Sequence, residues 1–360
     1  MDDVTNLERD AFADRMTTAA LGFFDILSIR LGDRLGLYRA LADHGPQSSA
    51  ELAGNAGIAE RYAREWLEQQ SVSGFVRVEG AGTRSARFSL PAGHAEVLLD
   101  PDSLVYSMPT VRNLMMLTRV MDALVEAYRT GGGVPWEFYG ADGREGVGDS
   151  NRPLYLQVMS QEWLPAIPSI HHRLGADPPA RVADIGCGTG WSSIAIALAY
   201  PGVTVHGFDK DRESIALARD NARANGVADR VSFQARDARE PGDGHAYDLV
   251  TFFECLHDMA RPVEALGAAR AMLADGGMVL VGDELTNDSF SGEFDDGERY
   301  HYGWSLLVCL PAAMTEPDSA GTGTVMRPAT LRGYAREAGF EGFEVLPIEH
   351  DAFRLYLLRP

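Results

Sequence analysis

The chain has 360 residues, of which 45% are hydrophobic and 23% are charged, and this composition predicts a globular protein large enough for two domains. Its formal net charge of -20 disfavours a nucleic-acid or anionic-membrane surface, because both are bound mainly through Lys and Arg side chains. We therefore expect neither nucleic acid nor a membrane as a partner.

The three cysteines, Cys187, Cys255 and Cys309, are isolated in the sequence. Without C-x-x-C spacing they predict neither a disulfide framework nor a structural zinc site. The acidic start of the chain lacks the pattern of a secretory signal, and no apolar run is long enough to cross a bilayer. We expect a cytoplasmic protein.

Residues 1–100 have the order of a winged helix, in which helices are followed by two short strands. The expected elements are a helix with Leu31, Leu35, Tyr38 and Leu41 at helical spacing, a helix opened by the capping box Ser48 to Glu51, a helix over 60–72, and a hairpin of 75–78 and 87–90. We predict that the third helix buries Tyr62, Ala63, Trp66 and Leu67.

The outward face of this third helix carries Glu60, Glu65 and Glu68, where a DNA-binding helix needs cations. We therefore interpret residues 1–100 as a dimerisation domain. Residues 101–178 are expected to be connecting helices that contribute to the acceptor site. One apolar stripe in them contains Leu114, Leu117, Met121, Leu124 and Tyr128.

From residue 179 onward, short apolar runs alternate with helix-length segments, which predicts an α/β domain with a parallel sheet covered by helices on both faces. The predicted strands are 181–185, 203–208, 231–235, 247–253 and 278–283, with a turn at 273–277 before the last of them. A helix over 330–339 and two final strands at 344–348 and 353–358 follow.

The first predicted strand ends in a glycine-rich turn, Gly186-x-Gly188-x-Gly190, where a ligand can approach the backbone closely. This is neither the G-x-G-x-x-G spacing of dinucleotide binders nor a P-loop. Acidic residues occur near the ends of successive strands: Asp184 before the glycines, Asp209 after the second strand and Asp237 after the third. In open parallel sheets ligands bind beyond these carboxyl ends, and a carboxylate there can accept ribose hydroxyls.

These motifs resemble the class I S-adenosylmethionine-dependent methyltransferases, a family with a Rossmann-like sheet and an antiparallel C-terminal hairpin. The resemblance implies that Asp184 and Gly186 hold the methionyl end of the cofactor, Asp209 the ribose and Asp237 the adenine. The further cofactor-binding residues that we expect are Gly188, Gly190, Lys210, Ala238 and Phe253. Carboxylates suit a sulfonium cation better than a pyrophosphate.

The segment Leu256-His257-Asp258-Met259 is similar to the Leu-His-Asp-Trp segment of small-molecule O-methyltransferases with an N-terminal winged-helix dimerisation domain. That resemblance implies a homodimer and makes His257 the base that removes the acceptor proton. Met259 departs from the pattern, because a Trp usually contacts the cofactor there. Glu254 and Asp283 are candidates to orient the base or to bind the acceptor.

We expect the acceptor to be a small aromatic hydroxyl compound, bound by Met159, Trp163, Tyr302 and Trp304, the last two in a cap insertion at 285–330. The acidic stretch 293–298 is predicted to be a solvated loop, and we expect no metal. The sequence leaves other functions open. They are N- or C-methylation by the same fold, loss of transfer with the cofactor retained, and a winged-helix transcription regulator with S-adenosylmethionine as effector.

Overall fold

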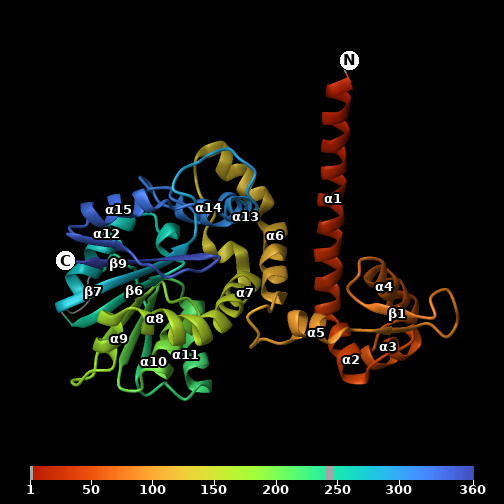
Figure 1. Cartoon of the computed structure of the whole chain (residues 1–360), viewed down its shortest axis with the longest axis horizontal. Coiled ribbons are helices and arrows are strands. Elements are labelled where there is room, and N and C mark those ends of the chain that lie inside the picture. Colours follow the sequence, from red (N-terminus) through yellow and green to blue (C-terminus); the bar gives the residue numbers. More distant parts are fainter. Residues whose placement is uncertain (1–2, 241–245) are drawn as a thin grey trace. The chain divides into compact units, whose positions relative to one another are not determined.

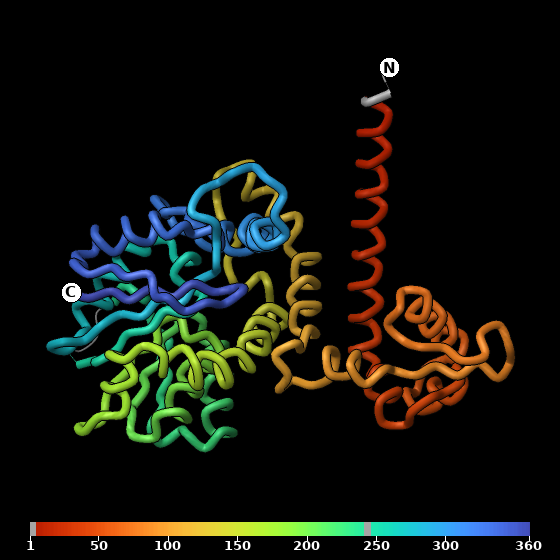
Figure 2. Tube along the Cα trace, viewed as in Figure 1, coloured from red at the N-terminus to blue at the C-terminus, as the bar shows by residue number. Residues whose placement is uncertain are grey.

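The computed structural model describes residues 3–240 and 246–360, which form two compact units, Met1–Met115 and Met116–Pro360. Figures 1 and 2 trace the chain through both units. Among the described residues, no helix is long and apolar enough to span a membrane. The boundary between the units falls inside the segment 101–178 that was expected to connect two domains, and the three-part division stays a prediction.

The first unit has the predicted order of helices followed by a hairpin, except that the helix expected to carry Leu31 to Leu41 is broken: one helix ends at Arg34 and the next begins at Leu37, with Gly36 at a φ of 67° between them. Its elements are α1 (Asp3–Arg34), α2 (Leu37–His44), α3 (Ser49–Ala56), α4 (Glu60–Val72), β1 (Arg77–Glu79), β2 (Arg87–Ser89), α5 (Ala92–Leu99) and the start of α6 (Met108–Thr130). The capping box is present, because the Ser48 side chain accepts from the Glu51 backbone and the Glu51 side chain accepts from the Ser48 backbone. β1 and β2 pair antiparallel.

One burial prediction in the helices is wrong, and one predicted apolar stripe is only partly buried. Ala63, Trp66 and Leu67 are buried as expected, but Tyr62 is 76% exposed, because it lies outside the arc of α4 that meets the core. In α6, Leu117 and Leu124 are buried, whereas Met121 and Tyr128 are exposed. The apolar stripe of a helix can be wider than the neighbouring elements that pack against it, and its uncovered apolar side chains then remain exposed to solvent.

The second unit contains a seven-stranded sheet in the order β5-β4-β3-β6-β7-β9-β8. Its strands are β3 (Arg181–Ile185), β4 (Thr204–Asp209), β5 (Val231–Ala235), β6 (Tyr247–Phe253), β7 (Leu273–Glu284), β8 (Gly342–Val345) and β9 (Phe353–Arg359). The first five strands run parallel, and β9 pairs antiparallel with β7 and β8. This confirms the predicted fold class, including the antiparallel C-terminal hairpin (Figure 2).

One predicted turn is part of a strand. Residues 273–277 were expected to turn into the fifth strand, but β7 already begins at Leu273, which pairs with Tyr247. The pairing shifts register between Tyr247 and Leu249, and Gly276 has a positive φ of 76°. Because glycine adopts this conformation without strain, the irregularity is accommodated inside the strand.

Helices cover both faces of the sheet, as Figure 1 shows. The parallel strands are linked and covered by α10 (Trp191–Ala199), α11 (Arg212–Ala224) and α12 (Pro262–Met272), and before the sheet lie η1 (Trp136–Tyr139), α7 (Gly140–Pro153), the π-helix η2 (Leu154–Trp163), α8 (Leu164–Ala166) and α9 (Pro168–Leu174). Among the described residues, four helices follow β7 in chain order: α13 (Asp296–Trp304), the π-helix η4 (Ser305–Cys309), α14 (Leu310–Ala313) and α15 (Pro328–Glu337).

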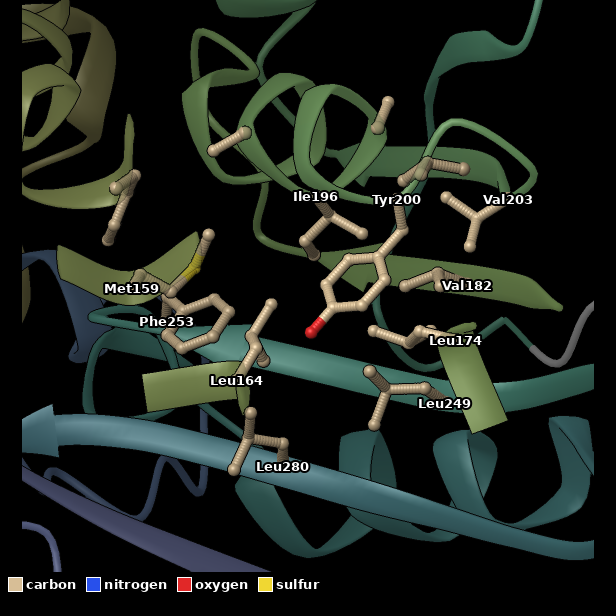
Figure 3. Close-up of a cluster of buried hydrophobic side chains, with 14 of the residues drawn as sticks. Met159, Leu164, Leu174, Val182, Ile196, Tyr200, Val203, Leu249, Phe253 and Leu280 are labelled. Atoms are coloured by element: carbon tan, nitrogen blue, oxygen red, sulfur yellow. The ribbon is translucent and has the colours of Figure 1, made fainter. Parts of the chain in front are cut away.

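Two hydrophobic cores result, one on each face. Val182 of β3 packs in the core with η2 and α10, where Met159 and Phe253 also lie (Figure 3), while its neighbour Ala183 packs with α12 and α15. This alternation buries β3 on both sides, as is usual for a central parallel strand. The chain leaves β3 between β4 and β6, at the point where strand order reverses and ligands bind in such sheets.

Candidate active site

The glycine turn between β3 and α10 has the backbone geometry that its sequence predicted. Gly186, Gly188 and Gly190 have positive φ angles of 68°, 50° and 85°. A Cβ on Gly190 would lie 2.6 Å from the ring of Phe233, so only glycine lets that ring pack beneath the turn. The Gly188 N–H donates to Asp209 Oδ2 at 2.9 Å, which links the turn to the end of β4.

Asp209 is the last residue of β4 and Asp237 follows the end of β5, so both acids lie at strand ends as expected. The Asp209 carboxylate also accepts from the Asp211 N–H at 2.8 Å, and burial raises its pKa. Asp237 is paired with Arg239, whose Nη2 lies 2.7 Å from Asp237 Oδ2 and whose Nη1 lies 2.9 Å from Glu316. Hydrogen bonds from Arg239 lower the pKa of Asp237. Sequence reasoning missed this pair, although a basic residue two positions after the acid was the visible signal.

Asp184 is 1% exposed and lies inside the fold, beneath the glycine turn. Its carboxylate accepts from Ser192 Oγ and Ser193 Oγ at 2.6 Å each and from Thr251 Oγ1 at 2.7 Å. Burial raises the pKa of Asp184, and these three hydroxyl donors oppose that rise. The carboxylate thereby ties β3 to the start of α10 and to β6, while its contact with a cofactor stays a prediction.

The remaining predicted cofactor residues differ in their surroundings. Lys210 is exposed, and Ala238 is half-buried against the core that contains α12. Phe253 is buried, with its ring centroid 5.7 Å from that of Tyr155. Their contacts with a cofactor also stay predictions.

His257 lies in the short helix η3 (Leu256–Asp258), just beyond the end of β6, and is 1% exposed. Its Nδ1 donates to Asp283 Oδ1 at 2.8 Å and lies 3.2 Å from Glu284 Oε2, both at the end of β7. Burial alone would lower the pKa of His257, but Asp283, Glu284 and Asp258 together raise it well above its ordinary value. The structure therefore brings together the predicted base and one of its two predicted partners.

Glu254, the other predicted partner, has a left-handed backbone with a φ of 48°, which is uncommon for a residue other than glycine. Its Oε2 accepts from Asn151 Nδ2 and, at 3.4 Å, from Tyr155 Oη. Burial, together with the nearby Glu284 carboxylate, raises the pKa of Glu254 to about 8. Strained backbone of this kind concentrates at functional sites, because the surrounding structure must hold it in place.

Two residues that the sequence did not single out lie on the other side of the His257 ring. Asp258 Oδ1 is 3.3 Å from His257 Nε2, and Cys309 Sγ of η4 lies within 4.8 Å of a ring nitrogen of His257 and of a carboxylate oxygen of Asp258. We call His257, Asp258, Asp283, Glu284 and Cys309 the histidine cluster. Among the described residues, Asp258 Oδ1, Asp283 Oδ2 and Glu284 Oε2 are buried and accept no hydrogen bond.

The four residues expected to bind the acceptor are dispersed. Met159 and Trp163 belong to the hydrophobic core, and the Trp163 ring contacts His350 and Phe353. Tyr302 is partly exposed and accepts from Arg327 at 3.2 Å. The Trp304 ring packs against Tyr300, with centroids 5.9 Å apart, and the part of these four residues in acceptor binding stays a prediction.

The acidic stretch 293–298, expected to be a solvated loop, is exposed over 293–297, but its last three residues already belong to α13. Asp295 caps α13 by accepting from the Glu298 N–H at 3.1 Å. Glu298 itself pairs with Arg327 at 2.6 Å, which joins α13 to the chain before α15.

Comparison with known proteins gives two family matches. Residues 176–327 match a family described as a methyltransferase domain, and residues 24–100 match an Rv2258c-like winged HTH domain. A ubiquinone biosynthesis O-methyltransferase of Burkholderia thailandensis is 34% identical over 206 residues, which are 55% of this chain and 78% of that protein. A 27-O-demethylrifamycin SV methyltransferase of Amycolatopsis mediterranei is 31% identical over 47% of this chain, and the match spans 65% of that protein, less than two thirds.

Among solved structures, human N-acetylserotonin methyltransferase in complex with S-adenosylmethionine superposes with a TM-score of 0.71. It covers all of this chain, the match includes 98% of the human chain, and the two sequences are 20% identical. At that identity the likeness concerns the fold, which the two proteins share through both the helical N-terminal part and the sheet.

Proposed function

Since the chain belongs to the S-adenosylmethionine-dependent methyltransferases with an N-terminal winged-helix domain, we propose that it methylates a hydroxyl group of a small aromatic acceptor, with His257 as general base. S-adenosylmethionine is the methyl donor of this family and S-adenosylhomocysteine the product. The observation that carries the proposal is the buried, oriented imidazole beyond the end of β6, beside the point where strand order reverses.

The residues around the glycine turn suit this cofactor. The turn leaves open space beside the Cα of Gly188, since a Cβ there would meet no described atom within 4 Å. Each oxygen of Asp209 accepts one backbone N–H and keeps a lone pair, so this carboxylate is able to accept ribose hydroxyls as well. We propose that Asp184, Gly186 and Gly190 shape the methionyl side and that Asp237, Ala238 and Phe253 border the adenine, with Lys210 at the rim.

His257 has the orientation that a base needs. Because Nδ1 is bound to Asp283, the lone pair for the acceptor proton belongs to Nε2. Bound S-adenosylmethionine supplies the electrophilic methyl group on a sulfonium cation. A nearby cation disfavours the protonated imidazole, so we expect the raised pKa of His257 to fall in the loaded site, where Nε2 takes the proton of the acceptor.

Glu254 supports the acceptor side of the proposal. Its raised pKa keeps a share of the carboxyl protonated at neutral pH, so the group is able to donate as well as accept a hydrogen bond. Asn151 and Tyr155 fix its position from α7 and η2. We propose that Glu254 orients the acceptor, and that Tyr302 and Trp304 of the cap insertion contact its ring.

We also propose a homodimer built through the N-terminal helices. α1 exposes large apolar side chains along its length, between 52% and 70% of each: Leu7, Phe12, Met16, Leu21, Phe23, Phe24 and Leu31. Such a surface is unusual for a helix that faces only water. The basic side chains of α4 are paired with acids, Arg61 with Glu65 and Arg64 with Glu60, which supports dimerisation rather than DNA binding as the role of this unit.

The test replaces His257 by Asn and follows methyl transfer to a panel of phenols. We expect kcat to fall by about 10²- to 10⁴-fold, the usual contribution of a positioned general base, while S-adenosylhomocysteine still binds. His206→Asn is the matched control, because His206 is a half-buried histidine of β4 that hydrogen-bonds Tyr247 outside the site. Unchanged turnover in His257→Asn would refute proton abstraction and favour an acceptor with a free lone pair.

A further inference from the structure

The Nε2 side of His257 presents an arrangement that proton transfer alone leaves unexplained. Asp258 Oδ1 is 3.3 Å from Nε2, and among the described residues no donor is aligned to hydrogen-bond this buried oxygen. Cys309 Sγ of η4 lies within 4.8 Å of a ring nitrogen of His257 and of a carboxylate oxygen of Asp258. Three electron-pair donors of different chemistry therefore converge on one point, which a cation would satisfy.

The other side of the imidazole is already engaged. The Nδ1–H donates to Asp283 Oδ1 at 2.8 Å, so Nε2, which faces Asp258, is the nitrogen that offers a lone pair to a metal once its own proton has left. A histidine that donates one ring N–H to a carboxylate while the other nitrogen faces further ligands is the usual arrangement around protein-bound zinc.

The spacing of the donors also agrees with a metal. In a tetrahedral zinc site, with bonds to N and O of about 2.1 Å, the two ligand atoms lie about 3.4 Å apart. The observed separation of Nε2 and Oδ1 is 3.3 Å. A thiol, an imidazole and a carboxylate together select a borderline-soft ion such as Zn²⁺ over Mg²⁺ or Ca²⁺, which prefer oxygen ligands alone.

We propose that His257 Nε2, Asp258 Oδ1 and Cys309 Sγ form a Zn²⁺ site, and that the bound ion blocks the nitrogen that removes the acceptor proton. Binding displaces the proton of the Cys309 thiol and the proton on His257 Nε2, and both are released to solvent. The proposal replaces the expectation from the sequence that no metal binds. Its inhibitory half rests on the proposed function, whereas the binding half does not.

The binding experiment uses the full chain after treatment with a chelator. Co²⁺ is titrated first, because a thiolate ligand produces a charge-transfer absorption band that imidazole and carboxylate lack, and Zn²⁺ is then added as competitor. We expect one equivalent to bind, the band to disappear in Cys309→Ser, and the affinity of this variant for Zn²⁺ to fall more than about 100-fold. Cys187→Ser, which removes a thiol of the glycine turn, is the matched control and keeps the band.

Two further variants test the geometry without altering the thiol. Asp258→Asn removes one ligand charge and should weaken Zn²⁺ binding while the shape of the side chain is retained. Asp283→Asn removes only the partner of Nδ1, and we expect affinity to fall by about 10- to 100-fold, as for other groups that orient a metal-bound histidine. Absence of stoichiometric binding in the wild type, or an unchanged band in Cys309→Ser, would overturn the site.

Inhibition is measured as the Zn²⁺ concentration that halves turnover, relative to each protein's own rate without metal. We expect this concentration to rise at least about tenfold in Cys309→Ser. If Zn²⁺ binds stoichiometrically but does not inhibit, the metal site stands and the proposal that the ion blocks the base is rejected. That result would also contradict the role of His257 as general base in the proposed function. Inhibition that Cys309→Ser leaves unchanged would reject this site as its cause.

Discussion

Gly190→Ala tests whether the glycine turn is set by the ring beneath it. At φ 85° an alanine adopts a left-handed conformation, which costs about 1–2 kcal/mol. Its Cβ would also lie 2.6 Å from Phe233 Cζ and 2.9 Å from Ala218 Cβ, and overpacking of a filled core adds about 1–3 kcal/mol. We therefore expect the free energy of unfolding to fall by about 2–5 kcal/mol in total.

The matched control is Gly188→Ala. Gly188 also has a positive φ, of 50°, but a Cβ there meets nothing within 4 Å, so only the conformational cost of about 1–2 kcal/mol applies. Urea unfolding of both variants without cofactor, followed by a signal from the sheet-containing unit, gives the difference. Adding Phe233→Leu to each variant should recover stability only in the Gly190→Ala background. Equal losses in the two alanine variants would refute the packing argument.

Three further predictions concern other parts of the chain. Asp184→Ala leaves three buried hydroxyls without an acceptor, and we expect about 3 kcal/mol of destabilisation in urea, where a loss below about 1 kcal/mol would be contrary evidence. Arg327 lowers the pKa of Glu298 in the folded protein. The pair therefore stabilises the fold fully at pH values above the pKa of Glu298 in the unfolded chain, and this stabilisation is lost as the pH falls through the lower pKa of Glu298 in the folded protein. The stability advantage of wild type over Glu298→Gln should therefore shrink between about pH 6 and about pH 3, and a constant advantage in thermal melts would reject the pairing. Phe12→Glu with Phe24→Glu should convert a dimer into a monomer in light scattering, and a wild-type protein that is already monomeric would rule out the proposed dimer.

Local chemistry in the sequence predicted much of the sheet. The bounds of β3, β5 and β6 agree with the predicted ranges. β3 and β6 are buried on both faces and read as apolar runs, whereas the edge strand β5 alternates buried and exposed residues. Tyr62 and Met121 show the limit of such reasoning. Periodicity defines a helix face, but whether another element covers that face depends on contacts between distant segments.

Some residues of the candidate site could be predicted from the sequence, and others could not. Gly186 and His257 follow strand ends and Asp209 ends β4. Because the carboxyl ends of parallel strands meet at one edge of the sheet, a sequence can place these residues together. Cys309 could not be placed, because it reaches His257 only through the π-helix η4 of the cap insertion. Asn151 was missed for the same reason, since 103 positions separate it from Glu254.

The position of β9 has a consequence for how the protein matures during synthesis. β9 is the last strand in chain order, yet it lies inside the sheet between β7 and β8 (Figure 2). Its residues Arg354 and Phe353 pair with Asp283 and Glu284, the carboxylates that hold His257. In a nascent chain that has been synthesised only as far as β7, the edge of β7 is therefore unpaired, and the backbone of Asp283 and Glu284 lacks its partner strand. We therefore expect His257 to acquire its orientation only after residues 353–359 have left the ribosome and paired with β7.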